Sequence, residues 1–279
     1  MSAVTAPGPV RRVAHVMGMP ISLAVRGRAG DDRDLADAWQ QAVATLQDVD
    51  RVFSTYRADS VVSRLGRGEI DLVDAPPEVA EVLALAERTR VESHGAFDVR
   101  RSDARGPGGT GGATTLDTDG VVKGWAVERA ARVLDALPDA DFCLSAGGDM
   151  VCRVADPAAA PWQVGVEDPA DPSRLLARIP VRNGGVATSA FTHRGAHIVD
   201  ARTGAVPGRV ASVTVVDDSL TWADIDATAA YALDSEAAEW LRSRHRTALV
   251  VWADGTVERT DPPDGQARRL LSSDSLSHR

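Results

Sequence analysis

An aspartate and a threonine near residue 225 are spaced so that their side-chain oxygens could bind one metal ion. Asp224 and Thr228 are four positions apart in a segment whose other residues are mainly apolar, namely Ile225, Ala227, Ala229, Ala230 and Leu233. In a helix, residues four apart share one face, so both oxygens would point the same way. Magnesium suits such a pair, because it takes one or two protein carboxylates together with phosphate and water. A solvated helix face is the alternative, but an aspartate in apolar surroundings needs a partner.

Two glycine-containing segments could bring backbone amides close to an anion. In residues 116–127, glycines stand beside the expected start of a helix, where amides can approach a phosphate, and Lys123 adds a positive charge. The spacing is not that of a P-loop, and a helix start with a surface lysine is the alternative. In residues 145–149, two glycines between apolar strands would form either a ligand contact or a hairpin turn.

A serine close to a histidine occurs after residue 186 and raises the question of a hydrolase. Thr188 and Ser189 precede His193 and His197. No GxSxG elbow is present and nothing orients a Ser–His pair, so a hydrolase is not favoured. The segment 200–204 is typical of a turn closed by glycine. His197 is either a ligand contact or a structural histidine.

Apolar periodicity outlines the elements that must position these residues. Helices cluster early in the chain and strands late, and the βαβ alternation of a doubly wound sheet is absent, so we expect an α+β fold. Thr221 is expected to cap the helix that carries Asp224. The expected elements are a strand or hairpin at 13–25, helices at 35–53, from 77 and after 124, strands at 142–146, 150–154, 162–167, 175–181 and 210–216, helices at 222–233 and 235–243, and a strand at 247–252.

The chain has 279 residues and a formal net charge of −9. An acidic surface repels nucleic acid and anionic lipid, so neither is expected as a partner, and a phosphorylated ligand needs a metal, a lysine or backbone amides. Cys143 and Cys152 do not form a CxxC pair and are expected to be buried structural residues.

No apolar run approaches the ~20 residues of a membrane span, and no apolar stretch typical of a secretory signal is found near Met1, so we expect a cytoplasmic location. We expect a disordered N-terminus at 1–10, one domain at 11–258 and a disordered tail at 259–279. The glycine-rich segment 106–115 is expected to be a flexible connection within that domain.

Taken in order, the motifs of this chain resemble those of the ApbE family of FAD:protein FMN transferases. They are MGMPIS, FSTYRADSVVSRL, GAFD, DTDGVVKGWAVERA, SAGGD, WQVGVEDP, VATS, HIVDARTG, SVTVV and ADIDATA, and they span roughly residues 13–233. The resemblance implies a two-lobed α+β fold with antiparallel or mixed sheets packed by helices. It further implies FAD in a cleft, Mg²⁺ at its pyrophosphate, and transfer of FMN to a threonine of an acceptor flavoprotein with release of AMP.

The resemblance also implies individual site residues. The metal would be held by Asp224, Thr228 and the backbone carbonyl of Val122. A general base near the acceptor hydroxyl is expected on chemical grounds; the sequence does not identify it, and Asp98 and His197 are our candidates. The flavin nucleotide would be contacted by residues of the matching motifs, namely Met17, Tyr56, Ala96, Phe97, Asp98, Asp119, Lys123, Trp125, Gly147, Gly148, Thr188, Ser189, His197 and Ile198.

The chain departs from the family pattern at a few places. Asp119 stands where glycine or a small polar residue is frequent, Val122 replaces alanine and Ala201 replaces proline. The segments between Asp98 and Asp117 and after Ser189 are shorter than the resemblance implies. Two other functions use the same residues. One is an FAD pyrophosphatase, in which water replaces the threonine, and the other is a flavin-binding protein without catalysis.

Overall fold

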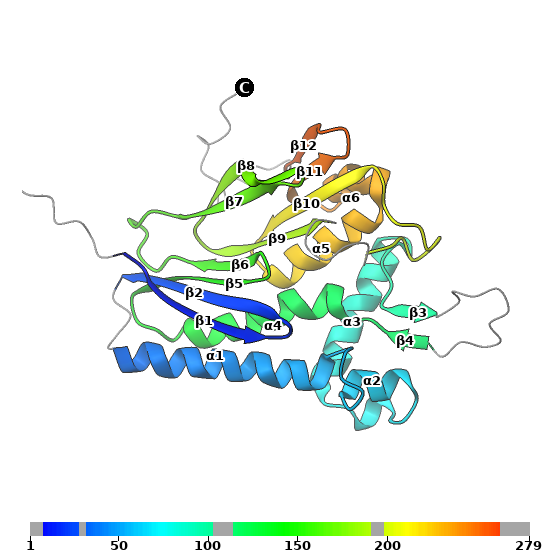
Figure 1. The fold of residues 1–279 in the computed structure, drawn as a ribbon, viewed down its shortest axis with the longest axis horizontal. Coiled ribbons are helices and arrows are strands. Elements are labelled where there is room, and N and C mark those ends of the chain that lie inside the picture. Colours follow the sequence, from blue (N-terminus) through cyan, green and yellow to red (C-terminus); the bar gives the residue numbers. More distant parts are fainter. Residues whose placement is uncertain (1–7, 28–31, 103–113, 191–197, 263–279) are drawn as a thin grey trace, which may run out of the picture.

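The computed structural model describes residues 8–27, 32–102, 114–190 and 198–262. Its centre is an antiparallel sheet of eight strands in the order β1-β2-β5-β6-β9-β10-β11-β12 (Figure 1). The fold is therefore α+β, as the sequence predicts. The strands are β1 (Val10–Val16), β2 (Met19–Gly27), β5 (Ala140–Ala146), β6 (Asp149–Arg153), β9 (Gly184–Ala190), β10 (Val210–Asp217), β11 (Thr247–Trp252) and β12 (Val257–Thr260).

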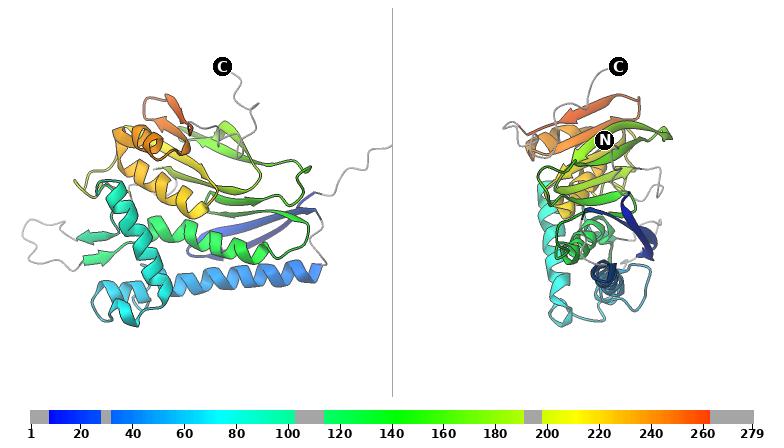
Figure 2. Two further views of the ribbon diagram at one scale, coloured as in Figure 1. Left: turned by 180° about the vertical axis from the view of Figure 1, so that it is seen from behind. Right: turned by 90° about the vertical axis from the view of Figure 1, so that its left-hand side faces the viewer.

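Helices cover one face of this sheet. Long amphipathic helix α1 packs against α4, and α4 packs against α5, which lies over β9 and β10. Helix α3 runs across the direction of α1, from the end of α1 towards α5, as the left view of Figure 2 shows in cyan. The helices are α1 (Asp32–Phe53), α2 (Val61–Gly66), α3 (Pro77–Glu92), α4 (Asp119–Leu134), α5 (Leu220–Ala232) and α6 (Ala237–Ser243), with 3₁₀ turns η1 (Leu72–Asp74) and η2 (Asp234–Glu236).

The other face of the sheet is covered by the hairpin of β7 (Trp162–Asp168) and β8 (Asp171–Val181). Successive strand residues point to opposite faces, so Leu144 and Val151 join the main core under the helices, whereas Cys143 and Cys152 join a smaller core under the hairpin. A short ladder of β3 (Arg100–Ser102) and β4 (Thr114–Leu116) stands apart from the main sheet.

The structure confirms most expected elements and corrects two of them. The third helix was expected after Gly124 but begins at Asp119, so Lys123 and Gly124 lie inside α4 and not ahead of it. The residue that caps α5 is Ser219, whose side chain accepts a hydrogen bond from Trp222 N, so the expected cap at Thr221 is wrong. Strands β3, β4, β9 and β12 and helix α2 were not expected from the sequence.

The expected terminal boundaries stay predictions. Strand β1 already includes Val10 and β12 runs to Thr260, while residues 1–7 and 263–279 lie outside the described part, as does most of the segment 106–115. In the described ranges, no helix has both the length and the apolar composition needed to cross a membrane.

Candidate functional site

The candidate site lies where α4 and α5 cross in antiparallel directions. A Cβ added to Gly120 would lie 3.0 Å from Thr228 Cγ2, and one added to Gly124 would lie 2.7 Å from Asp224 Cβ. Because both pairs are spaced by four residues, they form one line of contact between the two helices. The glycines allow the backbones to approach closely, and this places Asp224 and Thr228 against the first two turns of α4.

We expect a Gly124→Ala variant to be destabilised by about 1–3 kcal/mol, because its methyl group would meet the Asp224 side chain and the Leu220 carbonyl oxygen, 2.8 Å away. The higher helix propensity of alanine offsets only about 1 kcal/mol. Urea unfolding measures the change. Gly208→Ala is the matched control, since nothing lies within 4 Å of its added Cβ. Equal stability of the two variants would contradict the close crossing.

Asp224 is fixed by α4 through both carboxylate oxygens. The carboxylate is 1% exposed. Its Oδ2 atom accepts a hydrogen bond of 2.8 Å from the backbone N–H of Gly124, and its Oδ1 atom lies 3.1 Å from Lys123 Nζ. Each carboxylate oxygen can accept more than one bond, so Asp224 keeps the capacity to ligate a cation.

Lys123 joins Asp224 to a second buried carboxylate. Its Nζ atom lies 2.5 Å from Oδ2 of Asp149, the first residue of β6 and fully buried. The other oxygen of Asp149 accepts a hydrogen bond of 3.1 Å from the backbone N–H of Thr188. One ammonium therefore serves two carboxylates, and the cluster is left with one negative charge when all three groups are ionised.

The surroundings of Asp224 favour its protonated form. Burial raises the pKa of its carboxyl group to about 7, because the charged form loses hydration, and the Asp149 carboxylate adds to the effect while the Lys123 ammonium opposes it. A divalent cation beside Asp224 would supply the missing positive charge.

Hydroxyl groups extend the site from α5 to the sheet. Thr228 Oγ1 and Ser189 Oγ lie 3.2 Å apart, so the structure brings these two predicted residues together. The neighbouring Thr188 projects to the opposite face of β9, where its hydroxyl lies 2.9 Å from Thr214 Oγ1. Thr188 thus reaches the site through its backbone only.

The oxygens predicted as metal ligands are of the chemical kind that magnesium binds together with phosphate. Asp224 offers a carboxylate and Thr228 a hydroxyl, and Val122, whose backbone carbonyl is the third predicted ligand, lies in α4 between Gly120 and Gly124. All are hard oxygen donors, and magnesium is usually bound through one or two carboxylates plus substrate phosphates and water. No cluster of three or more His, Cys, Asp or Glu side chains suited to a metal occurs in the described ranges, so a site closed entirely by side chains is not favoured there.

Glu128 completes the contact between the helices and was missed by the sequence analysis. Its Oε2 atom accepts hydrogen bonds from Thr221 N (2.9 Å), Thr221 Oγ1 (2.7 Å) and Ser219 Oγ (2.7 Å). Glu128, which lies on α4, therefore accepts a hydrogen bond from a backbone N–H in the first turn of α5. A negative charge is favourable at the N-terminus of a helix. Burial acts to raise the pKa of this carboxyl group, but the bonds from Thr221 and Ser219 outweigh burial and leave the pKa below 4.5.

We expect Glu128→Gln to lower the free energy of unfolding at neutral pH by about 1.5–3 kcal/mol, since charge-assisted hydrogen bonds are lost. Because the folded-state pKa of Glu128 is depressed, its contribution is present above 4.5 and is lost as the pH falls below that value. Urea unfolding of both proteins between pH 7 and the acid limit measures this. A stability difference that does not shrink in acid would contradict the assignment.

The strand register gathers other predicted residues at one end of the sheet. Ile21 pairs with Ala146, so the β1–β2 turn, which holds Met17, lies beside the β5–β6 turn formed by Gly147 and Gly148. Both glycines have positive φ and close a hairpin, which bears out the turn interpretation. Their contact with a flavin stays a prediction.

The GAFD segment, residues 95–98 between α3 and β3, also reaches the crossing. The Phe97 ring packs against Gly120, with Cε2 at 3.0 Å from an added Cβ. Ala96 is buried, and its carbonyl oxygen accepts a hydrogen bond of 2.9 Å from Ala201 N, which joins this segment to the residues that precede β10, Ile198 among them. Asp98 is half-buried and its Oδ1 atom accepts a hydrogen bond of 2.8 Å from Arg100 N.

The remaining predicted residues differ in their surroundings. Trp125 is 4% exposed, and its indole N–H donates to Glu81 at 2.8 Å while its ring meets Phe53 edge-on. This indole is therefore a packing element between α1, α3 and α4. Tyr56 is 92% exposed. Asp119 is the first residue of α4, and His197 lies outside the described residues.

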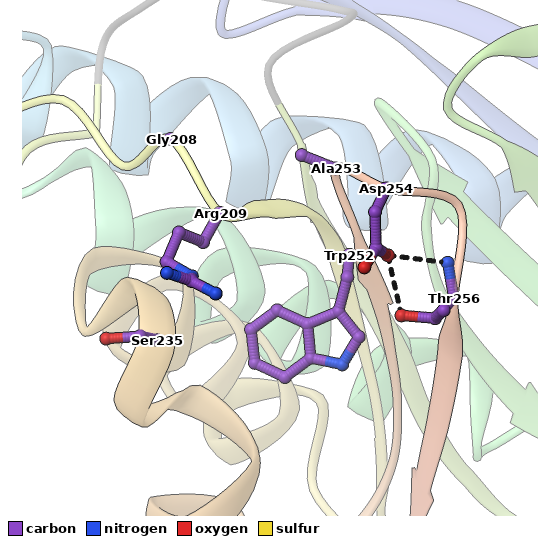
Figure 3. Close-up of a pocket in the computed structure, with 7 residues that line it drawn as sticks. All are labelled: Gly208, Arg209, Ser235, Trp252, Ala253, Asp254 and Thr256. Atoms are coloured by element: carbon purple, nitrogen blue, oxygen red, sulfur yellow. Dashed lines mark hydrogen bonds between the residues drawn. The ribbon is translucent and has the colours of Figure 1, made fainter.

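A surface hollow of about 530 Å³ lies elsewhere, around Trp252 and the start of β10 (Figure 3). None of the predicted site residues lines it. The Asp254 carboxylate in its wall already accepts hydrogen bonds from Thr256 N (2.9 Å) and Thr256 Oγ1 (2.6 Å) within the β11–β12 turn. The oxygen donors at the α4–α5 crossing are therefore the stronger candidate for chemistry.

The chain is similar to known proteins over most of its sequence. The sequence model of the ApbE family matches residues 17–104 and 109–251. The FAD:protein FMN transferase of Haemophilus influenzae is 25% identical over 266 residues, which cover 75% of this chain and 76% of that protein.

Two solved structures have the same fold. The ApbE protein of Thermotoga maritima has a TM-score of 0.77 at 21% identity and covers 90% of this chain and 97% of its own. The flavinyl transferase ApbE of Pseudomonas stutzeri has a TM-score of 0.77 at 20% identity, and the match covers 97% of this chain and 100% of that chain.

Proposed function

Because the chain belongs to the ApbE family, we propose that it transfers FMN from FAD to a threonine hydroxyl of an acceptor protein in a magnesium-dependent reaction that releases AMP. The single observation that carries the proposal is the crossing at which Asp224 and Thr228 of α5 meet the glycines of α4. It lies inside the part of the chain that matches the family, and relatives such as the Haemophilus influenzae protein bear the corresponding name.

In the proposed reaction the threonine oxygen forms a bond to the phosphorus of the FMN moiety, and the pyrophosphate P–O bond to AMP breaks. The threonine proton passes to a general base, for which Asp98 and His197 are our candidates. Magnesium, when bound, neutralises the pyrophosphate and aligns its oxygens. Asp224, Thr228 and the Val122 carbonyl would hold it.

The rest of the crossing keeps these donors in place. Lys123 and the Gly124 N–H each hold one oxygen of Asp224, so the carboxylate does not have to be ordered when substrate arrives. The absence of a side chain at Gly120 leaves Phe97 and Thr228 in contact with the start of α4. A net charge of −9 is compatible with FAD binding, because positive charge is needed only at the pyrophosphate.

The decisive experiment mixes the protein with FAD, Mg²⁺ and a panel of acceptor proteins that carry a candidate threonine. We expect a flavin-fluorescent acceptor band on a denaturing gel, AMP equal in amount to the modified acceptor, and loss of both when EDTA is added. Threonine→Val in the acceptor should abolish the band. Mass spectrometry of proteins encoded nearby and co-expressed with the enzyme identifies the natural acceptor by its FMN adduct.

The same assay separates the alternatives. AMP released at an equal rate without any acceptor would indicate an FAD pyrophosphatase instead. FAD that binds and remains intact in the presence of Mg²⁺, with no covalent flavin on any acceptor, would indicate a flavin-binding protein and would contradict the proposal.

A further inference from the structure

We propose that Cys143 and Cys152 form a reversible dithiol–disulfide couple on the face of the sheet opposite the α4–α5 crossing. The two thiols are free, and their sulfur atoms lie 3.8 Å apart. They are direct partners in the antiparallel ladder of β5 and β6. This inference does not rest on the proposed transferase function, since it uses residues on the other face of the sheet.

The hairpin geometry suits a disulfide. Gly147 and Gly148 have φ values of 56° and 98°, as in the two-residue turn that matches the twist of a hairpin. The pair that closes such a turn, Ala146 and Asp149, is hydrogen-bonded, and alternation along the ladder makes the cysteine pair, three steps away, a non-hydrogen-bonded one. Such pairs have Cα atoms about 4.5 Å apart, inside the range of about 4.4–6.8 Å seen in disulfides.

The surroundings give the two thiols different roles. Cys152 is fully buried among Val164, Val181 and Val186, whereas Cys143 is only half-buried. The hydrogen bond from Cys152 lowers the pKa of the Cys143 thiol, burial opposes this change, and Arg11 and Arg26 add to it. The same bond and burial raise the pKa of Cys152. Cys143 is therefore the group that reaches an oxidant as thiolate, and Cys152 is the resolving thiol.

The oxidant is a hydroperoxide. The Cys143 thiolate attacks its terminal oxygen, the O–O bond breaks, and the departing alkoxide or hydroxide takes a proton from water, which leaves a sulfenic acid on Cys143. The sulfur of Cys152 then attacks the sulfur of Cys143, the S–O bond breaks, and the Cys152 proton leaves with the hydroxide as water. An added dithiol reverses the reaction by thiol–disulfide exchange.

A soft-metal site is the less favoured use of this pair. Two sulfur ligands are too few for a tetrahedral site, and the described residues contain no group of three or more His, Cys, Asp or Glu side chains that could hold a metal ion.

The test treats the reduced full-length protein with one equivalent of hydrogen peroxide. Because the chain has only two cysteines, an intramolecular disulfide must join them. We expect both thiols to disappear in a titration under denaturing conditions, the intact mass to fall by two hydrogen atoms, the protein to stay monomeric on a non-reducing gel, and dithiothreitol to restore both thiols.

Matched single variants test the two roles. In Cys152→Ser, peroxide should leave a sulfenic acid on Cys143 that dimedone traps, whereas Cys143→Ser should react at least about tenfold more slowly. Two thiols that remain titratable in the wild-type protein after peroxide, a crosslink between chains, or oxygen addition without disulfide would overturn the proposal. The wild-type measurements decide the matter even where a variant fails to fold.

Discussion

An Asp224→Asn variant should lose at least about a hundredfold of the rate of covalent flavin transfer while it keeps its fold. The amide oxygen can still accept the hydrogen bond from Gly124 N, so the helix crossing stays closed. What is lost is the negative charge beside Lys123 that a divalent cation needs at the crossing. The measurement is the initial rate of fluorescent acceptor formation over a range of Mg²⁺ concentrations, with circular dichroism to confirm the fold.

Asp218→Asn is the matched control for this variant. Asp218 is an exposed aspartate just ahead of α5, so its removal changes the net charge by the same amount without touching the crossing. It should transfer flavin at the wild-type rate. If Asp224→Asn retains wild-type activity at limiting Mg²⁺, the carboxylate does not hold the metal and the proposed site is wrong.

The i,i+4 spacing made the pairing of Asp224 with Thr228 predictable from the sequence, because it depends only on helix geometry. The start of α4 was not predictable in the same way. A glycine within an apolar helical pattern favours a boundary when considered locally. Its actual role, close approach to Asp224 and Leu220, depends on a helix that lies 100 residues away in the chain.

The same reason explains why Asp149 and Glu128 were missed as members of the site. Asp149 belongs to the SAGGD motif, but its partners Lys123 and Thr188 are supplied by α4 and β9. A signal was present, since an aspartate that opens an apolar strand must find a partner when it is buried. Glu128 looks like a surface residue of α4 until α5 is placed with its N-terminus against it.

Trp125 shows the converse difficulty. Its position in a matching motif predicts a flavin contact, but a motif does not state which way a side chain projects. In the fold, its indole N–H donates to Glu81 and its ring packs against Phe53, on the side of α4 that faces α1 and α3. The motif predicted the location of the helix correctly, whereas the role of this side chain in binding stays untested.

The largest expected loss of stability comes from Asp226, two residues after Asp224 on α5. Its carboxylate is fully buried. Oδ1 lies 3.0 Å from Arg244 Nη2, and Oδ2 pairs with Arg246, which also reaches Asp217 at 2.6 Å. We expect Asp226→Ala to lower the free energy of unfolding by about 3–5 kcal/mol. The variant removes the carboxylate that the guanidinium groups of Arg244 and Arg246 share, so both lose a buried counter-ion.

Urea unfolding measures this loss, and Asp37→Ala, an exposed aspartate on α1, is the control, for which a change within about 0.5 kcal/mol is expected. A double variant, Asp226→Leu with Arg246→Met, should recover part of the stability, since apolar groups then replace one ion pair and only the Arg244 guanidinium loses its partner on α5. A loss below about 1 kcal/mol in Asp226→Ala would show that the ion-pair network does not hold α5 in place.

The two aspartates of α5 should also respond differently to ligand. If Asp226 only anchors the helix, FAD with Mg²⁺ will raise the unfolding midpoint of Asp226→Ala, because ligands that bind the folded state stabilise it by mass action. Part of its activity should return at low temperature. Asp224→Asn should show little midpoint shift with Mg²⁺ and no recovery of activity. This variant lacks the proposed metal ligand, whereas the ion pairs that anchor α5 are intact. A midpoint shift and recovery in both variants would remove the distinction between the metal donor and the anchor.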